Sequence, residues 1–485
     1  MASFLQPRVD GDLRSLLDDP GLLHQVADAL GSPVNVVLPG RLATNVRRFR
    51  DVYREHHLSG EIYLAHKANR SPALVRALAA TDAGIDVASL GELQHALGAG
   101  FGPDRIMATG PKSREYLWLA ARTGVVVTAD SVAELDALAT IIEDQDLPRV
   151  RVLARLSGFV SAGTNVMSRV SRFGIPADAT AALWAALDRH RSRLDFLGVA
   201  YHLDTVGLPE KAAALEGCLH VLDEAVRRGL RPRAVDLGGG FGVRYLAEER
   251  QWEAWSSELT GAVLGKRPPV TWNGHGYGLR NEAGTVRGAL GAYPAHRSVA
   301  GPAYLDALLR TESTAHRRPL GTLVLDHLYD LHVEPGRALL DQCGATLLRV
   351  EQVHDEGRGE TLVRVAGNHT DIGVDAHGVQ MDPLLVPREP RPEGPPGPAG
   401  VYLTGNLCLE ADLITRRKVF LPRLPRPGDL LVFANTAGYL MDFGAGHALM
   451  QPSARTVAAF RSGDGWRWCL DDRYWPVTGG EESNG

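Results

Sequence analysis

Short apolar runs alternate with amphipathic segments from about residue 60 to residue 340. The apolar runs predict buried strands at Glu61–His66, Gly84–Ala88, Arg105–Ala108, Val125–Thr128, Arg151–Leu156, Phe196–His202, Ala234–Leu237 and Leu331–Glu334. The segments between them predict helices over Pro72–Thr81, Leu90–Ala99, Ser113–Thr123, Val132–Glu143, Ala177–His190 and Glu210–Arg228. This alternation predicts a parallel (β/α)8 barrel of the TIM type. A doubly wound open sheet is the alternative, because alternation alone does not show closure.

The pattern changes after residue 340, where β-rich runs punctuated by glycine and proline replace the helices. We therefore expect an α/β barrel over residues 41–338 and an all-β domain, a β-barrel or sandwich, over residues 339–485. Residues 1–40 contain an apolar run, Val34–Leu38, outside the barrel rhythm, and we expect them to pack with the β domain. Residues 244–320 form an insertion that is either a lid or a surface subdomain. Residues 383–398 predict an exposed proline-rich loop.

Composition narrows the class of protein. The net charge is −5 and the pI is about 6.4, so nucleic acid and anionic membranes are not expected partners. No apolar run is long enough to span a bilayer, and the N-terminus lacks a signal-peptide core. The four cysteines lie far apart, which favours a reducing cytoplasm over disulfides or a zinc site. No HExxH motif is present, so no metal is expected.

Polar residues follow the predicted strands, and Lys67 is the most informative of them. It comes directly after the apolar run Ile62–Ala65, where an ammonium group is costly to bury. A desolvated lysine has a lowered pKa and can form a Schiff base, whereas a lone lysine at a strand end more often reaches solvent.

Other strand ends carry weaker signals. Gly238-Gly239-Gly240 follows an apolar strand and could cradle a phosphate or simply form a turn. His202 ends the sixth strand, and Glu334 and Arg337 end the eighth. Cys408 and the Gly438-Tyr439 pair lie in the predicted β domain, where an inert thiol and a packed turn are the plain interpretations.

Together and in this order, the motifs resemble those of the fold-type III PLP-dependent amino-acid decarboxylases, whose barrel is alanine racemase-like. The resemblance is greatest to diaminopimelate decarboxylase, with ornithine, lysine and arginine decarboxylases as relatives. It extends from about Ser32 to Phe443. It rests on the Ala65–Asn69 strand end, Gly84–Ser89 with Gly91-Glu92-Leu93, Arg172–Gly174, His202, the Gly238–Gly242 loop, Glu334–Arg337, the Cys408–Asp412 spacing and Ala437–Tyr439.

The resemblance implies that Lys67 carries PLP as a Schiff base and exchanges it for the amine of an amino-acid substrate. Decarboxylation would proceed through an external aldimine and a quinonoid carbanion. His202 would stack on the ring, and Glu334 would bond the pyridine nitrogen. Cys408 would protonate the carbanion from the other subunit of a homodimer. Other cofactor contacts are implied for Asp86, Thr205, Gly238, Gly239, Gly240, Gly336, Arg337 and Tyr439, and substrate contacts for Arg155, Arg337, Cys408, Glu410, Asp412 and Tyr439.

This chain also departs from the family pattern. The sixth strand ends in His202-Leu203-Asp204-Thr205 where the family has His-Ile-Gly-Ser, and Leu409 separates Cys408 from Glu410. The insertion and the proline-rich loop have no obvious counterpart. These differences favour a specialised decarboxylase of a diamino or other polar amino acid over diaminopimelate itself. A racemase or epimerase of the same fold is the enzyme alternative, disfavoured by Glu334 and Cys408, and a non-catalytic PLP-binding protein is the other.

Overall fold

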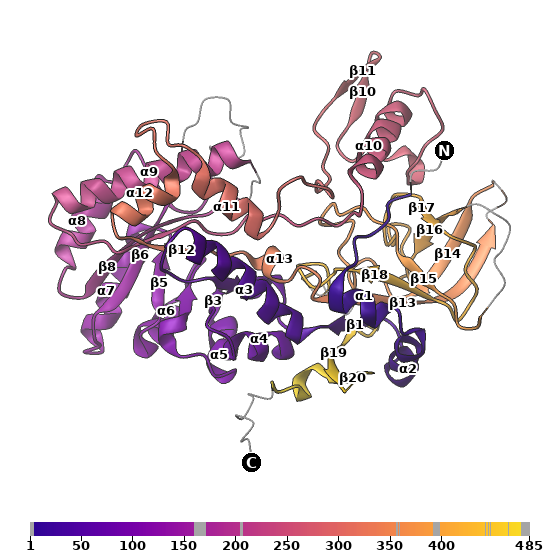
Figure 1. The fold of residues 1–485 in the computed structure, drawn as a ribbon, viewed down its shortest axis with the longest axis horizontal. Coiled ribbons are helices and arrows are strands. Elements are labelled where there is room, and N and C mark those ends of the chain that lie inside the picture. The colour runs from indigo at the N-terminus through magenta and orange to yellow at the C-terminus, as the bar shows by residue number, and fades with distance from the viewer. Residues whose placement is uncertain are drawn as a thin grey trace.

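The chain forms a helix-covered barrel and a β domain that lie side by side (Figure 1). The computed structural model describes residues 4–159, 171–203, 207–355, 357, 359–390, 398–441, 443, 444, 446, 448–463 and 465–476. In Figure 1 the barrel occupies the left half and the β domain the right half.

The barrel consists of parallel strands in the order β12-β9-β8-β6-β5-β4-β3-β2. A parallel bridge pairs Ile62 with Val333, and the Tyr63 N–H donates to the Val333 carbonyl at 2.8 Å, so the first and last strands meet. The barrel is therefore nearly closed, and the open-sheet alternative is wrong. The bounds are β2 (Tyr63–Ala65), β3 (Gly84–Val87), β4 (Ile106–Ala108), β5 (Val126–Ala129), β6 (Val150–Ser157), β8 (Leu194–Tyr201), β9 (Ala234–Asp236) and β12 (Asp330–His332), with β7 (Ile175–Pro176) beside β6.

Helices cover the outside of the barrel, and serine caps begin four of them. The hydroxyls of Ser71, Ser89, Ser113 and Ser131 each accept from the N–H three residues further on, as N-cap residues do. The helices α11, inside the predicted insertion, and α12, at its end, complete the ring, and neither helix was expected. The bounds are α3 (Pro39–Glu55), α4 (Pro72–Ala79), α5 (Leu90–Gly98), α6 (Arg114–Thr123), α7 (Val132–Asp144), α8 (Ala181–Arg189), α9 (Leu208–Arg227), α11 (Pro302–Arg310), α12 (Leu320–Asp326) and α13 (Gly336–Leu339).

The β domain is a mixed sheet that includes a strand from the N-terminal segment. β1 (Val34–Val37) lies between β13 and β19, antiparallel to the first and parallel to the second. α1 (Gly11–Leu17) and α2 (Pro20–Leu30) bury their leucines against this sheet. The other strands are β13 (Gly344–Asp355), β14 (Thr361–Ala366), β15 (Leu384–Val386), β16 (Ala399–Thr404), β17 (Val419–Leu421), β18 (Leu430–Ala434), β19 (Arg455–Ser462) and β20 (Gly465–Leu470).

Much of the insertion packs on the β domain. It contains α10 (Glu249–Val263) and the hairpin of β10 (Arg280–Glu282) and β11 (Thr285–Arg287), which project above the β domain in Figure 1. Thr271 forms a β-bridge with Arg417, and the Tyr277 hydroxyl donates to Asp375 at 2.9 Å. Within one chain this part of the insertion is a subdomain on the β domain.

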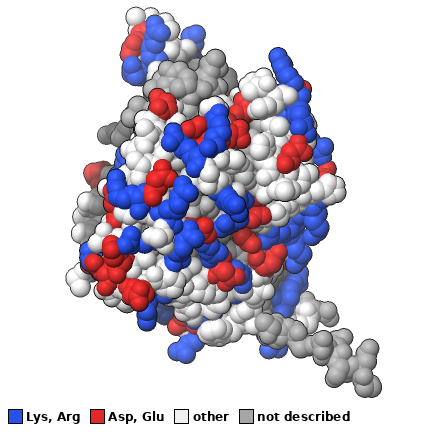
Figure 2. Space-filling model, turned by 90° about the vertical axis from the view of Figure 1, so that its left-hand side faces the viewer, with Lys and Arg blue, Asp and Glu red and all other residues white. Residues whose placement is uncertain are grey.

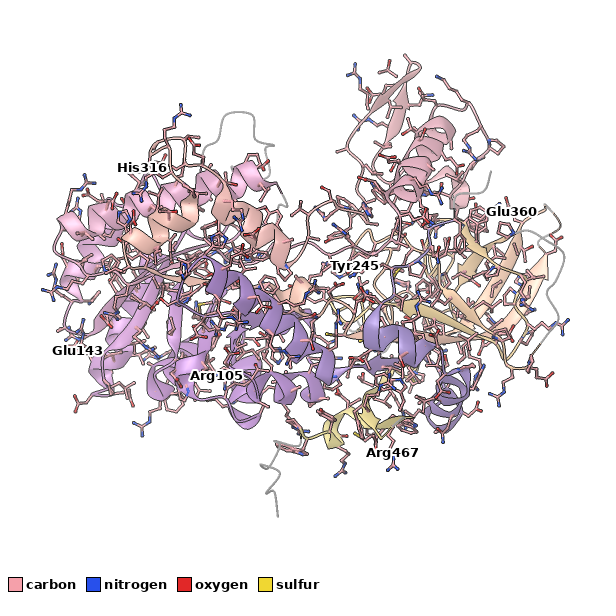
Figure 3. The ribbon with its side chains drawn as sticks, in the orientation of Figure 1. Arg105, Glu143, Tyr245, His316, Glu360 and Arg467 are labelled. Carbon is pink, nitrogen blue, oxygen red and sulfur yellow. The ribbon has the colours of Figure 1, made fainter. Side chains whose placement is uncertain are left out.

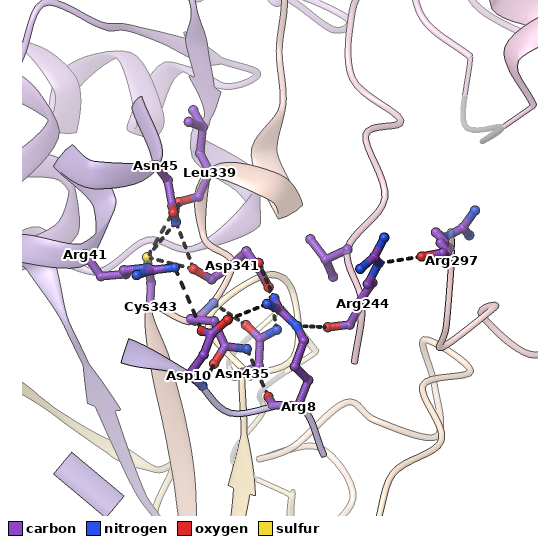
Figure 4. Close-up of polar contacts among 12 residues, drawn as sticks. Arg8, Asp10, Arg41, Asn45, Arg244, Arg297, Leu339, Asp341, Cys343 and Asn435 are labelled. Atoms are coloured by element: carbon purple, nitrogen blue, oxygen red, sulfur yellow. Dashed lines mark hydrogen bonds and ion pairs between the residues drawn. The ribbon is translucent and has the colours of Figure 1, made fainter. Parts of the chain in front are cut away.

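A polar network joins the N-terminal segment to the connection between the two domains (Figure 4). The guanidinium of Arg8 pairs with Asp10 at 2.6 Å and with Asp341 at 2.5 Å, and it also donates to the Arg244 carbonyl at 3.1 Å. Asn435 donates to the same Asp341 carboxylate at 2.8 Å. Asp341 follows the last barrel helix, so this network fixes where the chain leaves the barrel.

The surface carries both signs of charge. On the barrel side, lysine and arginine side chains alternate with acidic ones (Figure 2), in keeping with a net charge of −5. Among the described residues, no helix has the length and apolar character needed to span a bilayer.

Candidate active site

Lys67 lies at the point where the first barrel strand ends. β2 leads into a 3-10 turn, His66–Ala68, and Lys67 is its exposed middle residue. The β domain holds this turn from the other side, because Asn69 donates to the Ala437 carbonyl at 2.9 Å and the Tyr439 N–H donates to the Ala68 carbonyl at 2.8 Å. The position of Lys67 therefore depends on both domains.

The charge environment of Lys67 differs from the expectation. Although the side chain is exposed at the barrel mouth, the surrounding protein withdraws it partly from water, which lowers its pKa. The neighbouring Asp86, Tyr439 and Glu334 outweigh this effect, so the pKa of Lys67 is raised. Burial is the largest single effect on the pKa of Lys67, but the three negative groups together outweigh it, so the lowered pKa considered from the sequence is not found.

Three buried carboxyl groups surround the mouth of the barrel: Asp86 on β3, Asp236 on β9 and Glu334 just after β12. Burial, and then the charge of Glu334, raise the pKa of Asp86 to about 8 and raise that of Asp236 as well. Burial also acts to raise the pKa of Glu334, but its contact with His202 and the positive charges of Lys67 and Arg155 lower it to about 2. Glu334 is thus the group of the three that holds a negative charge most firmly.

His202 lies beside Glu334, at the end of β8. Its Nδ1 is 3.5 Å from the Glu334 carboxylate and accepts a hydrogen bond from the Gly239 N–H at 3.2 Å. Burial lowers the pKa of His202 despite the neighbouring carboxylate. The contact with His202 is nevertheless the largest effect that lowers the pKa of Glu334, ahead of the charges of Lys67 and Arg155.

The glycine loop passes tightly between two strand ends. Gly238 has φ +61°, and a Cβ there would lie 2.3 Å from the Tyr201 carbonyl oxygen. A Cβ on Gly239 would lie 2.9 Å from the Glu334 carbonyl oxygen. The Gly238 N–H donates to Asp236 at 2.8 Å, so the N–H groups of Gly238 and Gly239 both have protein acceptors.

Arg337 is enclosed by aromatic rings. Its guanidinium donates to the Tyr245 hydroxyl at 2.6 Å and to the Gly438 carbonyl at 3.2 Å. It lies 4.9 Å from the ring centre of Tyr293 and 5.0 Å from that of Tyr439. Tyr245 lies between the two domains (Figure 3), and both Tyr245 and Tyr293 belong to the insertion. The insertion therefore reaches the active-site region through these two tyrosines.

Arg155 and Glu92 are two further charged residues that interact with Lys67. Arg155 on β6 pairs with Asp130 at 3.3 Å and lies 5.0 Å from the Phe173 ring centre. Glu92 on α5 lies 3.3 Å from Nδ1 of His66, whose Nε2 is 2.8 Å from His95. The residue before Lys67 is thus held by a carboxylate and a second histidine.

The cysteine loop belongs to the β domain. Cys408 and Glu410 are exposed, whereas Asp412 is 4% exposed and accepts bonds from the Leu407 N–H at 2.7 Å and from His369 Nδ1 at 2.8 Å. Asp412 therefore shapes the loop that carries Cys408. No bond or ion pair among the described residues links this loop to the Lys67 group in the single chain.

The structure thus brings most of the predicted site residues together at the barrel mouth, whereas three of them lie on the cysteine loop. Thr205, like Asp204, lies outside the described residues. The residues gathered at the barrel mouth are Lys67, Asp86, Arg155, His202, Gly238, Gly239, Gly240, Glu334, Gly336, Arg337 and Tyr439; those on the separate loop are Cys408, Glu410 and Asp412.

Sequence reasoning missed Thr109, which donates to Asp86, and also Lys211, Asp236, Tyr245 and Tyr293. Asp236 had a usable signal, since a carboxylate within an apolar strand just before a glycine loop is costly to bury. The tyrosines had none, because their partner Arg337 is far away in the sequence.

Comparison with known proteins places the chain in a family. Residues 41–269 match the pyridoxal-binding domain of the pyridoxal-dependent decarboxylases. The uncharacterized protein y4yA of Sinorhizobium fredii is 32% identical over 424 residues, covering 87% of this chain and 86% of that protein. Diaminopimelate decarboxylase of Mycobacterium tuberculosis is 28% identical over 437 residues, covering 86% and 84% of the two chains.

Solved structures share the fold. Diaminopimelate decarboxylase of M. jannaschii, in complex with L-lysine, has a TM-score of 0.70 at 17% identity and covers 92% of this chain and 91% of its own. Arginine decarboxylase of Paramecium bursaria Chlorella virus, bound to agmatine, has a TM-score of 0.67 at 16% identity and covers 90% and 100%. The matched domain, the full-length relatives and the fold lead to one conclusion: the chain belongs to the fold-type III family of PLP-dependent decarboxylases.

Proposed function

We propose that this protein is a PLP-dependent decarboxylase of a diamino or other polar amino acid. The observation that carries the proposal is Glu334, a buried carboxylate whose pKa lies near 2, among the groups around Lys67. Such a carboxylate stabilises a proton on a pyridine nitrogen, and a protonated ring accepts electrons better. This arrangement supports loss of CO2 over racemisation.

The residues present fit PLP. Lys67 offers an amine at the open barrel mouth, Glu334 offers an ionised carboxylate, and the glycine loop offers backbone at Gly238 and Gly239, where a Cβ would clash. When bound, PLP supplies an electron-withdrawing ring that accepts the electron pair released when the carboxylate leaves the substrate.

The chain's own residues then have distinct tasks. Lys67 would hold the cofactor and release it to the substrate amine, and the flat ring of His202 would orient the cofactor. Glu334 holds a proton on the pyridine nitrogen. Tyr439, Gly240, Gly336 and Arg337 would hold the phosphate, with a supporting role for Asp86; Thr205, a further candidate, lies outside the described residues. Arg155 provides positive charge for a substrate carboxylate.

A distal polar group on the substrate is supported by two comparisons. The M. jannaschii structure holds L-lysine and the viral structure holds agmatine, and both molecules carry a distal cationic group. In this chain, Glu410 on the cysteine loop is an exposed carboxylate, and Asp412 shapes that loop. We assign Glu410 to the distal group, with Asp412 acting nearby.

The proposal includes a homodimer in which Cys408 of one subunit protonates the product at the site of the other. Exposed apolar side chains near the cysteine loop support an interface, because isolated proteins seldom expose apolar clusters without a partner. Leu409 on this loop is 53% exposed and Met450 is 94% exposed, and Phe443, which packs beside Tyr439, is 56% exposed. The Asn406 side-chain amide donates to the Gln451 side-chain oxygen at 3.5 Å, so the segment that carries Met450 lies beside the cysteine loop.

The first test is spectroscopic. Wild-type protein loaded with PLP should keep a visible absorbance after dialysis, whereas Lys67→Ala should lose it because the covalent bond to the cofactor cannot form. Lys266→Ala, which removes an exposed lysine, serves as the control and should retain the absorbance. Retention of the same absorbance by Lys67→Ala would overturn the assignment of Lys67.

The second test concerns the reaction. CO2 release by the PLP-loaded protein is measured against L-, D- and meso-amino acids with amine, guanidine or carboxylate side chains. We expect release from at least one member with a distal polar group. If no member loses CO2 while one racemises, decarboxylation is wrong.

A further inference from the structure

A lysine lies fully buried beneath the glycine loop. Lys211 is on the first turn of α9 and has 0% exposure, and its ammonium group donates to the Leu237 carbonyl at 3.2 Å and to the Gly239 carbonyl. It also lies 4.9 Å from the ring centre of Phe241 and 5.6 Å from that of Tyr201. Two of its partners are therefore main-chain atoms of the loop or its flank.

Burying an ammonium group is costly, and packing alone would favour an apolar side chain at this position. The two carbonyl oxygens and the two ring faces offset part of that cost. The bonds to the Leu237 and Gly239 carbonyls tie this buried charge to the glycine loop.

The direction of the peptides matters. In a trans peptide the C=O and the following N–H point in opposite directions. Because the Leu237 and Gly239 carbonyls face Lys211, the N–H groups of Gly238 and Gly240 point away from it. Asp236 accepts from Gly238 at 2.8 Å, whereas no described residue accepts from Gly240. Lys211 thus helps to aim the Gly240 N–H out of the loop, with a positive charge behind it.

Arg337 is another cation near the glycine loop, but its guanidinium is already held by protein groups. Its guanidinium is bonded to the Tyr245 hydroxyl and the Gly438 carbonyl and is flanked by tyrosine rings. A dianionic phosphate at the loop would gain from a second, fixed positive charge nearby.

We propose that Lys211 is a positioning residue for the phosphate group of the cofactor: it orients the glycine loop and supplies buried positive charge beneath it. This inference rests on the proposed function, since it takes the loop as the phosphate site. It assigns Lys211 no contact with the reacting atoms.

The experiment compares two cofactor forms that differ only in the phosphate. Dissociation constants of PLP and of pyridoxal are measured on apo-protein by absorbance titration, for wild type and for Lys211→Met. We expect the constant for PLP to rise about tenfold or more in Lys211→Met, and the constant for pyridoxal to change less than about twofold. Lys112→Met removes a different buried ammonium, one paired with Glu134 at 3.2 Å, and should leave the ratio of the two constants unchanged.

A second variant separates charge from folding. Lys211→Gln keeps a hydrogen-bond donor but loses the charge, so it should shift the PLP-to-pyridoxal ratio in the same direction. Circular dichroism and thermal melting identify any variant that fails to fold, and the variant that folds carries the test. If binding of PLP and of pyridoxal weakened equally, or if the ratio of their dissociation constants stayed unchanged, the role of Lys211 would be overturned. Failure of wild-type protein to bind either ligand would instead overturn the proposed function.

Discussion

Single side chains at the barrel mouth show how position changes chemistry. Asp86, Asp236 and Glu334 are all carboxyl groups and all at most 7% exposed, yet burial raises the pKa of the first two while positive neighbours lower that of Glu334. The sequence motifs located Glu334 and Asp86. They could not rank their proton affinities, because His202, Lys67 and Arg155, which lower the pKa of Glu334, come from other strands.

Replacing Glu334 tests this ranking. Glu334→Gln keeps the shape but cannot hold a proton on the ring nitrogen as a carboxylate does. We expect PLP-loaded Glu334→Gln to retain its visible absorbance while CO2 release slows by about 100-fold or more. Glu351→Gln, at an exposed position on β13, should leave the rate unchanged. A near-normal rate in Glu334→Gln would remove Glu334 from the mechanism.

At the scale of elements, all eight predicted barrel strands are confirmed, with ends that differ by at most two residues. The helices α11 and α12 were not expected, although α11 carries a usable signal. Its buried Tyr304, Leu305, Leu308 and Leu309 have helical spacing. The length of the surrounding insertion obscured that pattern.

The last barrel strand also contains a buried titratable group. His332 on β12 is 6% exposed, and its Nδ1 accepts from the Glu61 N–H at 3.0 Å. Burial lowers the pKa of His332 to about 4. An unfolded histidine takes up a proton near pH 6.5, whereas the folded protein keeps His332 neutral until about pH 4. The contribution of His332 to the free energy of unfolding is therefore fully present above pH 6.5 and falls by up to about 3 kcal/mol as the pH drops toward 4.

The measurement is the free energy of urea unfolding at pH 7 and pH 4.5. Wild type should lose about 2 to 3 kcal/mol more than His332→Asn on acidification, because the variant has no imidazole to protonate. His57→Asn is the matched control, since His57 is exposed and asparagine tolerates its φ of +56°. Equal losses in wild type and His332→Asn would show that His332 is not responsible.

At the scale of the whole molecule, the two ends of the chain meet in one sheet. β1 pairs with β13 and β19, which lie more than 300 residues further on, and Asp382 accepts from the Leu5 N–H at 2.7 Å. The β domain in turn supplies Tyr439 and Ala437 to the turn that holds Lys67. Cys408 lies on the same domain, and no hydrogen bond or ion pair among the described residues links it to Lys67, so the proposal assigns Cys408 to the site of a second subunit.

Mixing two inactive variants tests the shared site. Lys67→Ala lacks the cofactor lysine, and Cys408→Ala lacks the proton donor from the partner. If subunits exchange and each site uses one residue from each chain, an equal mixture should recover about one quarter of wild-type activity. The recovered activity is measured as CO2 release before and after mixing, and each variant alone is the control. No recovery despite demonstrated subunit exchange would place both residues in one chain's site, against the proposal.

The sequence by itself determined the succession of strands and helices in the barrel, the β-rich second part and the family, because periodicity and short ordered motifs are local properties of the chain. Closure of the barrel came from the structure, through the bridge between Ile62 and Val333. It also located Lys67 and Glu334 at strand ends. Only the tertiary structure decided that the pKa of Lys67 is raised, that insertion tyrosines enclose Arg337, and that Lys211 lies beneath the glycine loop. These properties arise between residues that are distant in sequence, and electrostatics and packing depend on distance in space.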